Sequence, residues 1–191
     1  MKRNLTMAAI LAMAVILTNC SESNPTAESV EPEGPTYNFV EGHAPVWNEA
    51  IAQIMELAES MPEDSYGFTP HDSVRTFAQQ LLHIGGSSVM IANMFLKDIM
   101  PEGEGPPPDP EVDMSKEEII ASVKQNLEDT WEIMKSMSDQ QLDEEIKSFS
   151  GNTMSRREGL LLVHDHLTNH KAKANLYVRI SGNEPPSYRY Y

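Results

Sequence analysis

Apolar side chains recur every three or four residues along four long stretches of the chain, which is the spacing of one helix face. The pattern predicts helices from about Pro45 to Met61 and from about Ser73 to Leu96, and two more that begin after Ser115 and Ser155. No stretch alternates with a period of two for long enough to predict a strand. Four long amphipathic segments in a domain of this size predict an all-α fold, a four-helix bundle.

The last two helices begin with the same capping signal. Ser115 is followed three residues later by Glu118, and Ser155 by Glu158, so that each hydroxyl and carboxylate satisfies a free backbone amide. We expect the last helix to run to about Ile180 and a short helical piece to cover 139–146. Residues 101–110 contain five prolines and two glycines, which predicts a long, disordered loop and permits either an up-down or a crossover topology.

The N-terminus carries the pattern of a secretory signal. A basic pair precedes an apolar run over 7–17 that is too short for a permanent transmembrane helix. The run ends in the sequence LTNC, which resembles a bacterial lipobox, so residues 1–19 are predicted to be a lipoprotein signal peptide and Cys20, the one cysteine in the chain, to be lipidated. An ordinary signal peptide or an uncleaved anchor is the alternative.

The composition of residues 20–191 separates a tether from a folded domain, and the net charge limits the partners that the protein can bind. Residues 20–40 are rich in Ser, Pro and Glu and predict a disordered tether, and 41–191 form the predicted bundle. The net charge is −15, and loss of the two basic residues in 1–19 leaves 12 basic against 29 acidic residues, or −17. This charge argues against a nucleic acid or an anionic lipid as partner. The predicted location is the cell envelope, lipid-anchored, facing the periplasm or on the outer membrane.

Three histidines are the candidate chemistry. His166 and His170 are one helical turn apart, so their Cβ atoms lie about 5–6 Å apart on one face. Two such imidazoles can share one metal ion, and a third from a neighbouring helix would leave a coordination position open, as in catalytic zinc sites. His83 is the candidate third ligand, because it lies off the apolar stripe beside Gln79, Gln80 and Ser87. A chance spacing of ordinary surface or core histidines is the alternative.

Two groups of residues form longer motifs. One is Asp165-His166-Leu167-Thr168-Asn169-His170, Tyr177-Val178-Arg179, Gly182 and Pro185-Pro186. The other is Met61-Pro62-Glu63, Tyr66, Phe68, Pro70, Val74-Arg75-Thr76-Phe77 and Leu81-Leu82-His83-Ile84. Together they resemble the last helix, the first loop and the second helix of the DinB-like (YfiT-like) superfamily, and the likeness covers about residues 45–186.

The resemblance implies a four-helix bundle, often a homodimer, that binds a divalent metal through His83, His166 and His170. Zn, Ni and Fe are the candidate ions, since imidazole suits each of them. Some relatives are thiol-dependent transferases or isomerases, and others have no assigned activity. Many have a second His and an Arg-Gly-Gln sequence where this chain has Asn169 and Lys171-Ala172-Lys173, so the small-molecule substrate does not follow from the family.

Two functions therefore stay open. The first is a metal-dependent hydrolase or thiol transferase, for which no catalytic side chain is assigned, although Glu128, Asp129 and Glu132 are available as a general acid or base. The second is a non-catalytic envelope lipoprotein that acts as a binding or interaction module. His164 falls on a different helix face from the metal candidates, and His43 is expected just before the first helix, so neither is predicted to be a ligand.

Overall fold

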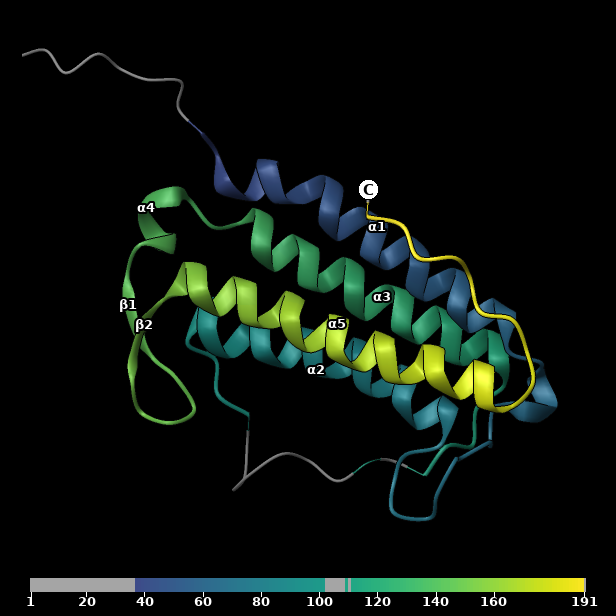
Figure 1. Ribbon diagram of the computed structural model, residues 1–191. Helices are drawn as coiled ribbons and strands as arrows, with labels where there is room; N and C mark the ends of the chain where they lie inside the picture. The colour runs from purple at the N-terminus through teal and green to yellow at the C-terminus, as the bar shows by residue number, and fades with distance from the viewer. Residues whose placement is uncertain (1–36, 102–108, 110, 191) are drawn as a thin grey trace, which may run out of the picture. The chain divides into compact units, whose positions relative to one another are not determined.

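The computed structural model describes residues 37–101, 109 and 111–190, and these form four long helices (Figure 1). The long helices are α1 (Phe39–Ser60), α2 (Phe77–Lys97), α3 (Lys116–Lys135) and α5 (Arg156–Ile180). The smaller elements are η1 (Glu63–Ser65), α4 (Asp139–Leu142), β1 (Glu145–Lys147) and β2 (Thr153–Ser155). The predicted all-α bundle is confirmed, with a small hairpin added to it.

The helices are arranged so that α2 packs against α3 and α5, and α1 packs against the same two helices from the other side. Figure 1 shows that α2 and α3 run in one direction and α1 and α5 in the other. The chain must therefore return along the length of the bundle between α2 and α3, which is the crossover topology that the long second connection permitted.

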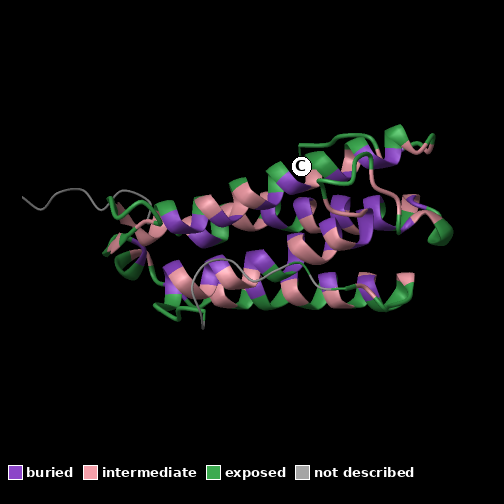
Figure 2. Cartoon of the chain, turned by 90° about the horizontal axis from the view of Figure 1, so that it is seen from below, coloured by how far each residue is buried: buried purple, intermediate pink, exposed green. Residues whose placement is uncertain are grey.

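The core lies along the shared axis of the four helices, and Figure 2 shows the buried positions gathered on their inner faces. The largest fully buried side chains are Trp47, Phe77, Ile54, Leu57, Met61, Leu81, Ile84, Ile119, Leu127, Met134, Leu142 and Leu160. They come from every long helix, so burial of these apolar faces is what holds the bundle together.

Three long helices begin with a complete capping box. Ser115 and Ser155 each accept a bond from the backbone amide of the glutamate three residues later, as predicted. A third box at Thr76 and Gln79 starts α2 at Phe77, so the predicted start at Ser73 was wrong. Val74 continues the apolar spacing of α2 toward the N-terminus, but it is 45% exposed in the preceding loop.

Helix α1 begins six residues earlier than predicted. Asn38 caps it by accepting a bond from the backbone amide of Glu41, and Pro45 lies inside the helix instead of in its first turn. A proline removes only one helical donor, and here the carbonyl left without that donor belongs to the exposed Glu41. His43 consequently lies within the helix and not before it.

The segment after α3 is only partly helical. Helix α4 stops at Leu142, and β1 then pairs antiparallel with β2, with Ile146 opposite Met154. Gly151 has a φ of 81° in the turn, which favours glycine. The predicted helical piece over 139–146 was therefore correct for its first turn and wrong for the remainder.

Helices α2 and α3 approach each other closely at Gly85. A Cβ added there would lie 3.1 Å from the Cα of Val123, whereas one added at Gly86 would meet nothing within 4 Å. Of the two adjacent glycines in α2, only Gly85 is therefore needed for the close approach of α3.

Among the described residues, no helix is both long and apolar enough to cross a membrane. The signal segment 1–19, Cys20 and the tether up to Thr36 lie outside the described residues, as do 102–108 and Pro110 in the proline-rich loop. The domain boundaries and the disorder predicted for these segments stay predictions.

Candidate metal centre

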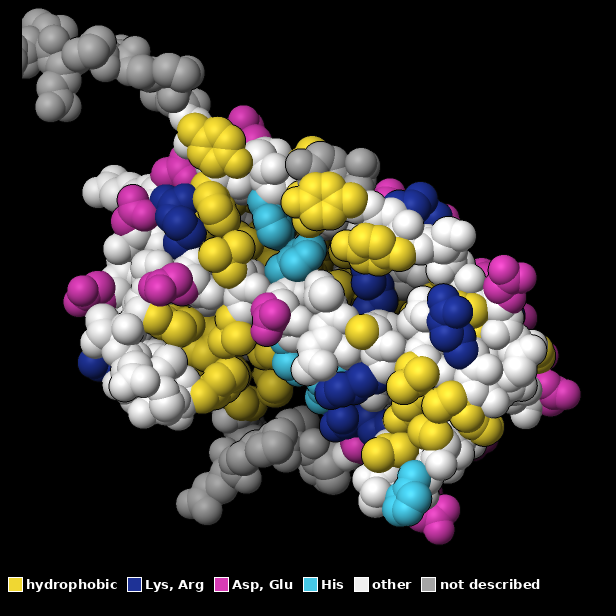
Figure 3. All heavy atoms as spheres, in the orientation of Figure 1, with side chains coloured by type: hydrophobic (Ala, Val, Ile, Leu, Met, Phe, Trp, Pro, Cys, Tyr) yellow, Lys and Arg dark blue, Asp and Glu magenta, His cyan; other side chains and the backbone are white. Residues whose placement is uncertain are grey.

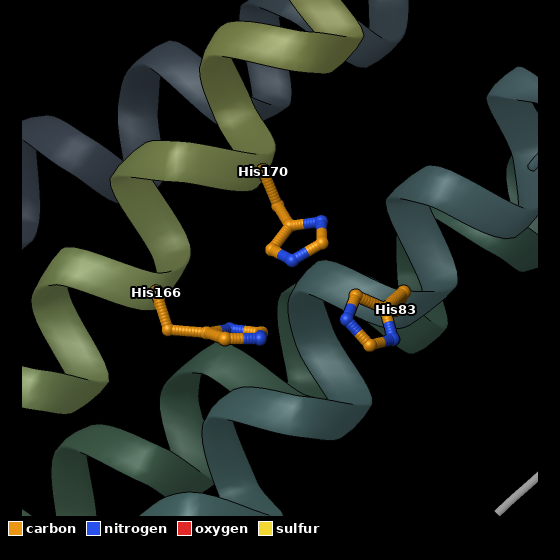
Figure 4. Close-up of side chains that lie close together, drawn as sticks. All are labelled: His83, His166 and His170. Carbon is orange, nitrogen blue, oxygen red and sulfur yellow. The ribbon is translucent and has the colours of Figure 1, made fainter. Parts of the chain in front are cut away.

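The three histidines singled out in the sequence lie together between α2 and α5. His83 projects from α2, and His166 and His170 project from successive turns of α5 (Figure 4). One possible ligand atom of each residue lies within 4.8 Å of those of the other two. His170 is buried, whereas His83 and His166 are half-buried, so the cluster is reached from the surface on one side.

The spacing of the rings fits one shared ion. The ring centroids of His170 are 4.4 Å from those of both His83 and His166, and the latter two are 5.2 Å apart. An imidazole nitrogen lies about 1.1 Å from its ring centroid and about 2.1 Å from a bound zinc, so rings on one ion have centroids about 4.5 Å apart at a right angle and about 5.2 Å apart at a tetrahedral angle. All three separations therefore agree with coordination of one metal.

Two polar side chains of α2 hold the histidines of α5. The Ser87 hydroxyl donates its proton to the carbonyl of His83, and its oxygen lies 3.3 Å from Nδ1 of His166. Because that proton is already used, the oxygen accepts a bond from an Nδ1–H of His166, which leaves Nε2 of that ring with a free lone pair. Metal-binding histidines are commonly oriented by such an outer partner.

Gln80 contacts the buried histidine through its amide nitrogen, which is a donor, so Nδ1 of His170 accepts the bond in this arrangement. Its Nε2 lies 2.6 Å from Nδ1 of His170 and donates to the carbonyl oxygen of the same residue at 3.2 Å. Gln80 is 2% exposed, so this contact is shielded from water. The sequence placed Gln80 and Ser87 on the same helix side as His83, but it gave no signal that they contact the histidines of α5.

The surroundings keep all three imidazoles neutral. Burial is the main cause that lowers the pKa of His83 to about 4 and that of His170 to about 3, and it also lowers the pKa of His166. The positive charges of Arg75 and Lys173 lower all three pKa values further. A neutral imidazole is the form that binds a metal, so the cluster is in its ligand form at neutral pH.

The acidic residues of α3 do not lie in this site. Glu128, Asp129 and Glu132 are exposed, and each is paired within α3: Glu128 with Lys124, Asp129 with Gln125 and Glu132 with Lys135. Helix phase alone could not decide where they point. The structure therefore supports none of them as a general acid or base at the three histidines.

A second pair of histidines lies between α1 and α5. The rings of His43 and His164 are 5.0 Å apart in an edge-to-face arrangement, and Trp47 lies beside both. His43 Nε2, His164 Nδ1 and the Trp47 indole nitrogen are buried, with no hydrogen-bond partner in the part of the chain that the structure describes. The expectation that His43 precedes the first helix was wrong, because the helix begins earlier, whereas His164 does lie outside the three-histidine group as predicted.

Known proteins provide an independent comparison. The chain is 28% identical over 137 residues to the uncharacterized protein YjoA of Bacillus subtilis, an alignment that covers 70% of this chain and 86% of that protein. The crystal structure of the same DinB-like protein matches with a TM-score of 0.62 at 25% identity, covering 78% of this chain and 97% of that one. A DinB-like protein from Bacillus cereus matches with a TM-score of 0.64 at 18% identity, covering 80% of this chain and 98% of that one, which supports the fold alone.

The family model of the DinB superfamily matches residues 47–174, which include the three histidines and most of the four long helices. This match covers more than half of the chain and agrees with the fold and with the resemblance found in the sequence. The chain belongs to the DinB superfamily.

Proposed function

We propose that this chain is a divalent-metal-binding protein whose three-histidine site serves a metal-dependent enzyme, either a hydrolase or a thiol transferase. The observation that supports this function is the convergence of His83, His166 and His170, whose ligand atoms lie within 4.8 Å of one another. Among the described residues, that group includes no fourth His, Cys, Asp or Glu. Three protein ligands leave room for water or substrate, as catalytic sites require.

Each residue of the site has a defined part in this proposal. The three neutral imidazoles hold the ion, for which Zn, Ni and Fe are the candidates. Ser87 fixes the ring of His166 and Gln80 that of His170. A bound divalent ion supplies Lewis acidity, which lowers the pKa of a water or thiol at the open position.

Metal content tests the proposal directly. Protein lacking residues 1–20 keeps the whole compact unit 37–191, and after metal-replete expression it should carry close to one divalent ion per chain by elemental analysis. His83→Ala and His166→Ala should each lose most of it, because two imidazoles bind an ion much less tightly than three. His71→Ala is the matched control, since His71 is exposed and bonded to Ser73. Full metal retention in either ligand variant would remove that residue from the site.

An open position separates an enzyme site from a structural one. In cobalt-substituted protein, azide, imidazole or a small thiol should change the visible spectrum, because it adds a ligand to the ion. A spectrum indifferent to all three would reject the enzyme and favour the non-catalytic binding module.

We also propose that the protein is attached to the cell envelope through a lipid on Cys20, which the sequence LTNC and the preceding apolar run support. More than one acyl chain on that cysteine would make the attachment stable. The full-length protein expressed in a bacterial host should incorporate labelled palmitate, and Cys20→Ser should abolish the labelling. Unlabelled wild-type protein would defeat this assignment.

A further inference from the structure

A cavity of about 550 Å³ lies at the end of the bundle where α2 begins. Its walls include Arg75, Gln80, Lys173 and Tyr177. Gln80 separates the cavity from the buried ligand, because the same side chain contacts Nδ1 of His170. We propose that this cavity binds the carboxylate group of a small organic acid, which is the substrate class of the metal site. This inference rests on the function proposed above.

Two positive side chains define the chemistry of the cavity. Arg75 and Lys173 both line it, and their charges lower the pKa values of all three histidines, which places them within electrostatic reach of the site. Figure 3 shows basic side chains gathered directly beside histidines on this face. The whole chain has a net charge of −15 and therefore repels anions. The two neighbouring cations, Arg75 and Lys173, attract anions to this cavity in particular.

Arg75 already holds a carboxylate in this structure. Its Nε lies 2.7 Å from Oδ1 of Asp109, and the two side chains are 28% and 33% exposed. A guanidinium binds carboxylates through two parallel hydrogen bonds, so a ligand carboxylate can displace Asp109 or share the guanidinium with it. Lys173 is exposed and makes no ion pair among the described residues. The second cation is therefore available to the same ligand.

The size of the cavity and the charges that line it limit the class of ligand that it can bind. Cavities of about 300–1,000 Å³ hold small molecules, so the volume suits a metabolite-sized acid. Asp72 also lines the cavity, and its negative charge opposes the attraction of the two cations for an anion. Together with Asp109 it disfavours a highly charged anion, which leaves a mono- or dicarboxylate as the best match.

The first test uses metal-free protein, which keeps the anion separate from the ion. Malonate added at constant ionic strength should raise the melting temperature relative to chloride. Arg75→Gln and Lys173→Gln should each weaken malonate binding about tenfold, since each removes a charged hydrogen-bond donor. Asp109→Asn should strengthen it, because the competing carboxylate is gone. Arg179→Gln is the control, since Arg179 is exposed on α5 and does not line this cavity.

The second test joins the anion to the metal. Mercaptoacetate and 2-mercaptoethanol offer the same thiol, and only the first has a carboxylate, so cobalt-loaded protein should bind mercaptoacetate at least tenfold more tightly. Arg75→Gln should remove this preference. Equal affinities in the wild type, or malonate binding that neither Arg75→Gln nor Asp109→Asn changes, would overturn the carboxylate proposal. A cobalt spectrum indifferent to both thiols, with malonate binding retained, would reject the metal-dependent function and leave the anion site standing.

Discussion

The contact between Gln80 and His170 gives a quantitative prediction for metal affinity. Gln80 is 2% exposed, and its amide lies 2.6 Å from Nδ1 of the buried ligand. Gln80→Met keeps the length and apolar volume of the side chain but removes both polar atoms. A metal on Nε2 of His170 requires a proton on Nδ1, so the Gln80 amide must turn its oxygen toward Nδ1 to accept that proton. Loss of such an outer partner weakens metal binding about 10–100-fold, or about 1.4–2.8 kcal/mol. We expect Gln80→Met to bind zinc more weakly by that factor.

The same substitution should also affect the metal-free protein. Nδ1 of His170 would become a buried polar atom without a hydrogen bond, which lowers the free energy of unfolding by about 1–3 kcal/mol. Gln80→Glu behaves differently, because a carboxylate accepts a bond from an Nδ1–H and makes the opposite nitrogen a better metal ligand. The glutamate variant should therefore be less stable without metal, since it buries a charge, yet bind zinc at least as well as wild-type protein.

Competition with a chromophoric chelator measures the zinc affinities, and urea unfolding measures the stabilities. Gln53→Met is the matched control: Gln53 is 4% exposed, lies on α1 and bonds to Glu49 and to the carbonyl of Arg189, away from the three histidines. It should lose stability without losing zinc affinity. A zinc affinity for Gln80→Met within twofold of wild type, or an equal loss in Gln53→Met, would refute the role given to Gln80.

Two further predictions concern stability. Gly86→Ala should raise the free energy of unfolding by up to about 1 kcal/mol, because it improves helix propensity in open space, whereas Gly85→Ala should lower it by about 1 kcal/mol or more, because its Cβ would lie 3.1 Å from the Cα of Val123. Urea unfolding of both variants checks this, and shifts of the same sign would contradict it. In the folded protein the pKa of His83 is lowered to about 4 and that of His170 to about 3. In the unfolded chain these histidines take up protons as the pH falls below about 6.5, which favours unfolding. The metal-free protein should therefore lose stability between pH 7 and 5.5, and the His83→Asn variant should lose less over that range. Melting temperatures measured against pH check this, and identical slopes for the two proteins would exclude His83 as a contributor.

The parts of this fold that could be predicted are those encoded by local signals. The capping boxes at Ser115 and Ser155 fixed the starts of α3 and α5, because the hydroxyl and the glutamate act within one turn. The start of α2 was missed because Val74 continues the apolar spacing, while the box at Thr76 decides where the helix begins. The hairpin was missed because strands of three residues are too short to display an alternation.

The residues of the candidate site also include some that the sequence could predict and others that it could not. His166 and His170 could be paired from their spacing, since both belong to one helix. Gln80 contacts His170 although the two residues lie 90 positions apart in the chain. Arg75 acts on the histidines through its charge, and neither effect leaves a mark in the spacing of residues. Their parts in the site could be seen only once the packing of α2 against α5 was known.

The distribution of the three histidines along the chain affects when the proposed metal site can form. His166 and His170 come together as soon as α5 forms, but His83 joins them only after α2 has docked on α5. Until its last helix has left the ribosome, a nascent chain therefore presents only His83, and the three-histidine site and the finished fold arise together. A chain translocated in the unfolded state would complete the site only after crossing the membrane. The ion bound at the proposed site would then be set by the ions present where the chain folds, and not by those present where it is synthesised.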